Sequence, residues 1–136
     1  MATAVGAGMV ATFGAQLIWT RGFTKYEEQI EENRKYWSSF VEEFPPKPVA
    51  IAGVMALGGI HGAGYAAARP LLPRQPIAAG AVYGAATYFS AFGANHLVRR
   101  HYGLREPPPR LLSLRELAGH VLHGAAIGWL ASRASC

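Results

Sequence analysis

Histidines are the residues best suited to chemistry in this chain of 136 residues. His61, His96, His120 and His123 fall inside long segments that contain no charged residue, whereas His101 follows two arginines in a polar segment. An imidazole can ligate a metal, relay a proton or hold two helices together by hydrogen bonds. Ionisable groups in such apolar segments are costly to bury, so each one is a functional hypothesis.

Glu116 and His120 are spaced to share one face of a helix. They are four residues apart, and His96 is expected at a similar depth near the end of the preceding helix. We predict that His96, Glu116 and His120 form a polar cluster that joins these two helices. A metal site built from the same three residues is the alternative hypothesis.

His61 and His123 are candidates for a site embedded deeper in the protein. Counted along straight helices, His61 lies roughly 20 Å and His123 roughly 10 Å from the same boundary. This difference in depth argues against a haem held between them. In a transporter, His61 and the Glu116–His120 pair could line the path of the transported species.

Familiar catalytic motifs are absent from the sequence. There is no phosphate-binding loop, no HExxH and no CxxC, and Cys136 is the single cysteine. We therefore expect no catalytic residue, no resident cofactor or metal, and no enzymatic activity.

The elements that must position these residues follow from the placement of charge. Charged residues make up only 15% of the chain, and segments 1–20, 48–68, 75–98 and 117–132 contain none. A membrane-spanning helix needs about 20 mostly apolar residues. We predict an all-α integral membrane protein, a four-span antiparallel helical bundle forming one domain over 1–136. The expected spans are 2–20, 48–68, 76–98 and 114–132.

The distribution of basic residues predicts the orientation in the membrane. Ten of the 13 Lys and Arg residues lie in connectors 21–47 and 99–116. The positive-inside rule places both connectors in the cytoplasm and both termini on the opposite side. A bacterial inner membrane is the predicted location, with a mitochondrial or plastid membrane as the alternative. The bias also explains much of the net charge of +5, so no nucleic-acid partner is expected.

Two connectors have patterns of their own. Pro70 and Pro73 predict a tight turn over 69–75, which would fold the second and third spans into a hairpin. Segment 23–44 has apolar residues at alternating spacings of three and four, which predicts an amphipathic interfacial helix. Its predicted partner-docking face consists of Phe23, Tyr26, Ile30, Trp37, Phe40 and Phe44.

Small residues recur four positions apart in every predicted span. This spacing lets helix backbones approach closely, as in GxxxG motifs. The predicted helix-packing residues are Gly58, Gly62, Gly80, Gly84, Gly124 and Gly128.

The region from Ile51 to Arg133 resembles the YagU-like family of bacterial inner-membrane proteins. The resemblance is carried by the segments 69–73 (RPLLP), 80–84 (GAVYG), 102–104 (YGL) with the prolines that follow, and 116–120 (ELAGH). It implies a multi-span inner-membrane protein and adds no activity. The region before residue 48 departs from the family pattern.

Together these features predict a non-catalytic accessory or scaffold subunit of a larger membrane complex. The expected partners are the lipid bilayer and other membrane subunits. A small transporter or channel is one alternative, and a haem- or metal-binding redox subunit is another.

Overall fold

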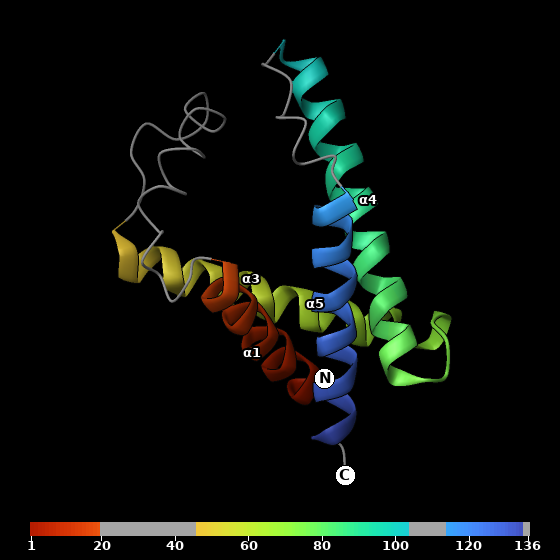
Figure 1. Ribbon diagram of the computed structural model, residues 1–136. Helices are drawn as coiled ribbons and strands as arrows, with labels where there is room; N and C mark the ends of the chain where they lie inside the picture. Colours follow the sequence, from red (N-terminus) through yellow and green to blue (C-terminus); the bar gives the residue numbers. More distant parts are fainter. Residues whose placement is uncertain (20–45, 104–113, 135–136) are drawn as a thin grey trace.

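The computed structural model describes residues 1–19, 46–103 and 114–134. These residues form α1 (Ala2–Trp19), α3 (Lys47–Ala68), the short 3-10 helix η1 (Arg69–Leu71), α4 (Pro76–His101) and α5 (Leu114–Arg133) (Figure 1). The prediction of an all-helical protein is confirmed for this part of the chain. The predicted docking helix over 23–44 lies outside the described residues.

Prolines and one glycine mark the helix ends. Pro48 and Pro76 stand in the first turns of α3 and α4, where a missing N–H costs nothing. The side chain of Gln75 caps α4 by accepting from the N–H of Ala78. Gly103 follows α4 with a φ of 63°, a left-handed conformation that favours glycine. The helix thus extends to His101, past the boundary expected at residue 98.

Two helices meet the length and composition of a membrane span. They are the segments Pro48–Leu71 and Pro76–His101, and Ala2–Ile18 forms a shorter apolar helix. By these criteria the described chain has two helices that could cross a membrane.

The helices pack as two close pairs, α1 with α3 and α4 with α5, and α1 also packs on α5. Figure 1 shows α3 strongly inclined to α4 and α5. The predicted hairpin of the second and third spans is wrong, because α3 and α4 make only sparse contacts with each other. Each of these helices instead uses its small residues against a partner distant in sequence.

In the α1/α3 pair the two backbones are in direct contact. A Cβ atom at Gly62 would collide with the carbonyl oxygen of Ala4, and one at Gly8 would collide with that of Gly58. A Cβ at Gly58 would lie 2.6 Å from Oγ1 of Thr12. Only glycine permits this approach.

The α4/α5 pair repeats the arrangement. Added Cβ atoms at Gly80, Gly84 and Gly128 would collide with the carbonyl oxygens of Gly124, His120 and Pro76 respectively. Contact positions that rise along α4 fall along α5, so the two helices run in opposite directions at this crossing.

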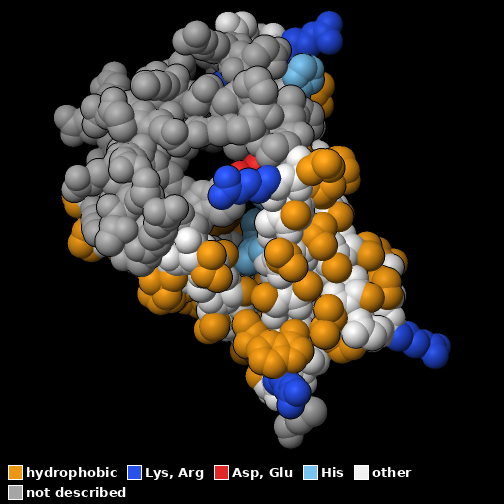
Figure 2. Space-filling view, viewed as in Figure 1, with side chains coloured by type: hydrophobic (Ala, Val, Ile, Leu, Met, Phe, Trp, Pro, Cys, Tyr) orange, Lys and Arg blue, Asp and Glu red, His pale blue; other side chains and the backbone are white. Residues whose placement is uncertain are grey.

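The interior is built mainly from small side chains. The buried apolar residues are Ala4, Ala7, Ala11, Tyr65, Ala79, Tyr88 and Ile127. Many large apolar side chains are instead exposed, and Figure 2 shows them spread over the visible face of the helices.

Candidate functional site: a histidine cluster

His61 of α3 and His123 of α5 lie side by side. Their ring centroids are 5.8 Å apart and the ring planes are inclined by 54°. The expected separation of about 10 Å in depth is therefore wrong. Counting residues compares depths on two helices only when the helices run parallel, and Figure 1 shows α3 strongly inclined to α5.

Thr12 connects this histidine pair to α1. Its Oγ1 shares a hydrogen bond of 2.8 Å with Nε2 of His123, and both side chains are partly buried. The hydroxyl can donate to a neutral Nε2 or accept from a protonated one. The bond joins the two helix pairs, since Thr12 belongs to the α1/α3 pair and His123 to the α4/α5 pair.

His120 is held by its own helix. Its Nδ1–H donates to the carbonyl oxygen of Glu116 at 2.9 Å. This bond places the proton of the neutral ring on Nδ1 and leaves Nε2 as an acceptor. Tyr88, itself buried, packs edge-on against the imidazole with ring centroids 5.3 Å apart.

Tyr83 brings α4 to the cluster. Its hydroxyl donates to the carbonyl oxygen of His61 at 2.9 Å, and its ring stacks edge-on with Tyr65. A Cβ atom at Gly64 would collide with this hydroxyl, so the glycine makes room for the bond. Thr12, His61, Tyr83, His120 and His123 thus link all four long helices. We call these five residues the histidine cluster.

The sequence predicted a polar cluster of His96, Glu116 and His120, with a metal site as the alternative. His96 lies partly buried near the end of α4, and Glu116 lies in the first turn of α5. Among the described residues no group of three or more His, Cys, Asp or Glu side chains is placed to hold a metal ion. The hypothesis that these three residues form a metal site is therefore wrong. Their structural role stays a prediction.

Sequence reasoning missed Thr12 and Tyr83. In the sequence, Thr12 simply continues the four-residue spacing of Ala4 and Gly8. Tyr83 stands beside Gly84 in the packing face of α4. A polar side chain within a small-residue face is the signal that could have marked both, because it lies where helices meet.

Chemically, the histidine cluster can exchange protons and supply ring nitrogens to a ligand. Nε2 of His123 is already engaged by Thr12, which leaves Nδ1 as its other ring nitrogen. The cluster holds hydroxyls and imidazoles but no carboxylate side chain.

Comparison with known proteins finds no matching protein family, no matching curated protein and no matching solved structure. The resemblance to the YagU-like family stays a prediction.

Proposed function

We propose that this chain is a small integral membrane protein that serves as a non-catalytic accessory subunit of a larger membrane complex. The observation that supports this proposal is that small side chains fill the interior while large apolar side chains lie on the surface, the opposite of a water-soluble protein. Glycine and alanine fill the helix contacts, whereas bulky apolar residues face outward.

The outward residues come from every long helix. Exposed fractions are 82% for Ile18, 65% for Ile60, 60% for Phe89 and 70% for Leu122. So many exposed large apolar side chains are unfavourable in water and need lipid or protein around them. The small residues inside gain close backbone contacts that lipid chains cannot replace.

In this proposal α1 and α5 cross the membrane together with α3 and α4. Helix α1 has 18 residues, which at about 1.5 Å per residue span about 27 Å of a core near 30 Å. Helix α5 has 20 residues but carries Arg115 and Glu116 in its first turn and Arg133 at its end. Both would be accommodated by slight local thinning of the bilayer.

The proposed location is a bacterial inner membrane, with both termini opposite the cytoplasm. Extraction of cell membranes with alkaline carbonate tests insertion, because only an integral protein stays in the pellet. Purification in mild detergent then tests the accessory role. Co-purification of defined membrane subunits supports it, and a lone monomer without any partner contradicts it.

The histidine cluster favours a second candidate function, a small proton or ion transporter. Its imidazoles and hydroxyls join all four long helices, the place where a path between them would run. Proton flux into liposomes that contain the purified protein tests this candidate. Flux that His123→Ala abolishes and Thr87→Ala spares would favour transport over an accessory role. A third hypothesis, a haem-binding redox subunit, is tested by the absorption spectrum of the purified protein.

A further inference from the structure

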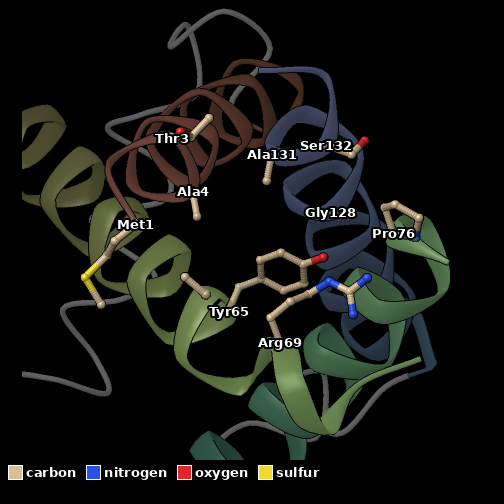
Figure 3. A pocket seen from close by; sticks show the side chains of 10 residues that line it. Met1, Thr3, Ala4, Tyr65, Arg69, Pro76, Gly128, Ala131 and Ser132 are labelled. Carbon is tan, nitrogen blue, oxygen red and sulfur yellow. The ribbon is translucent and has the colours of Figure 1, made fainter. Parts of the chain in front are cut away.

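A cavity of about 290 Å³ lies at the end of the molecule where α1 and α4 begin and α3 and α5 end. Figure 3 shows it ringed by residues of all four helices. Its apolar walls include Ala4, Ala66 and Ala131, and the polar side chains that line it are those of Thr3, Tyr65, Arg69 and Ser132. The histidine cluster does not line it.

Tyr65 lines this cavity, and its hydroxyl has no hydrogen-bond partner among the described residues. The residue is only 3% exposed, and its ring is held edge-on by Tyr83 at a centroid distance of 5.7 Å. No group in the described part of the chain hydrogen-bonds to its hydroxyl. Buried hydroxyls are almost always hydrogen-bonded, so the cavity must supply the partner.

Arg69 brings a fixed positive charge to the same cavity. Its guanidinium donates to the carbonyl oxygen of Pro73 at 2.8 Å and to that of Arg74 at 2.6 Å. These bonds anchor the side chain without neutralising it, and they use only two of its N–H groups. In Figure 3 the side chains of Tyr65 and Arg69 both extend toward α5.

The charged side chains of the described residues at this end of the molecule are all basic. Arg69, Arg74 and Arg133 lie at this end of the molecule. Glu116 is the only acidic side chain in the described residues, and it stands at the opposite end of α5. The starts of α1 and α4 and the ends of α3 and α5 meet here, so the helix dipoles largely offset one another and the positive potential comes from the arginines.

We propose that this cavity binds the phosphate group of an anionic lipid. Arg69 pairs with the phosphate, and the Tyr65 hydroxyl donates a hydrogen bond to it. The alanine walls receive the first methylene groups of the lipid chains. The volume suits a headgroup rather than a whole lipid. Leu71 and Ile77 are exposed and follow the lining residues Arg69 and Pro76 closely in the chain, so they offer an apolar surface for the lipid chains.

The choice of a lipid rests on the proposed membrane location, since inorganic phosphate would satisfy the same polar groups. Titration calorimetry of the full-length protein in neutral detergent separates the two sources. The probes are dihexanoyl phosphatidic acid, inorganic phosphate and dihexanoylglycerol, which has the same chains without the phosphate. We expect binding of the phosphatidic acid and no measurable binding of dihexanoylglycerol.

Three variants locate the site. Arg69→Gln should weaken binding of the phosphatidic acid about tenfold or more, and Tyr65→Phe about threefold to tenfold, because each removes a hydrogen bond to a charged group. Arg133→Gln is the matched control. It removes a charge from the same end of the molecule but does not line the cavity, so the affinity should change less than about twofold.

Each possible result of the calorimetry either supports or contradicts the proposal. Equal binding of inorganic phosphate would support the phosphate site with the free ion as its source. Equal binding of dihexanoylglycerol, or unchanged affinity in both Arg69→Gln and Tyr65→Phe, would overturn the proposal. Tyr65→Phe retains the ring that packs on Tyr83, so it keeps the test valid if Arg69→Gln misfolds. A chain that carbonate extracts from membranes yet still binds phosphate would contradict the membrane location alone.

Discussion

The backbone contact between α4 and α5 predicts opposite effects of one substitution at two positions of α4. Gly80 is buried, and a Cβ atom there would collide with the carbonyl oxygen of Gly124. Gly93 lies on the same helix with nothing within 4 Å of an added Cβ. Gly80→Ala should therefore destabilise the fold, and Gly93→Ala should not.

The magnitude follows from two competing terms. Replacing a helical glycine with alanine gains up to about 1 kcal/mol of helix propensity at either position. At Gly80 the new methyl group meets backbone, which cannot rotate away, so the helices must separate. Overpacking of this kind costs about 1–3 kcal/mol. We expect a net loss of about 1–2 kcal/mol for Gly80→Ala and a gain of up to about 1 kcal/mol for Gly93→Ala.

Unfolding in detergent, followed by circular dichroism at constant protein concentration, measures both variants. The reciprocal contact offers a further check, because a Cβ at Gly124 would collide with the carbonyl oxygen of Gly80. Once one alanine has separated the helices, the second should cost less, so Gly80→Ala with Gly124→Ala should be less destabilising than the sum of the singles. A Gly80→Ala protein as stable as Gly93→Ala would refute the close crossing of α4 and α5.

Three other predictions concern the interface of the helix pairs, the docking face and the topology. Thr12→Val should lower the free energy of unfolding by about 0.5–1.5 kcal/mol because it removes the hydrogen bond to His123. Unfolding in detergent measures this change, and an unchanged stability would show that the bond does not stabilise the fold. Trp37→Ala combined with Phe40→Ala should release the protein from its complex while leaving it in the membrane fraction, and unchanged co-purification would show that segment 23–44 is not the docking surface. Reporter fusions at Cys136 should be active only outside the cytoplasm, and the reverse pattern would contradict the orientation drawn from the Lys and Arg distribution.

Local features of the sequence sufficed to predict the helical class and where α3 and α4 begin. Charge-free segments, prolines at 48 and 76, and small residues four apart are properties of a single helix and its immediate flanks. They can be read without knowing any contact. The exposure of Ile60 and Leu122 likewise accords with the apolar composition of their segments.

The choice of partner for each helix was decided by tertiary structure alone. Every predicted span offered small-residue faces, so spacing could not tell whether α3 would pack on α4 or on α1. In the observed pairing α3 is inclined, and the ring centroids of His61 and His123 lie 5.8 Å apart. Counting residues along each helix had placed the two histidines at different depths. The cavity with Tyr65 and Arg69 was equally unforeseen. It is lined by the ends of four helices, of which only the end of α3 and the start of α4 are close in the chain. The convergence of the other ends depends on angles between helices that no local pattern specifies.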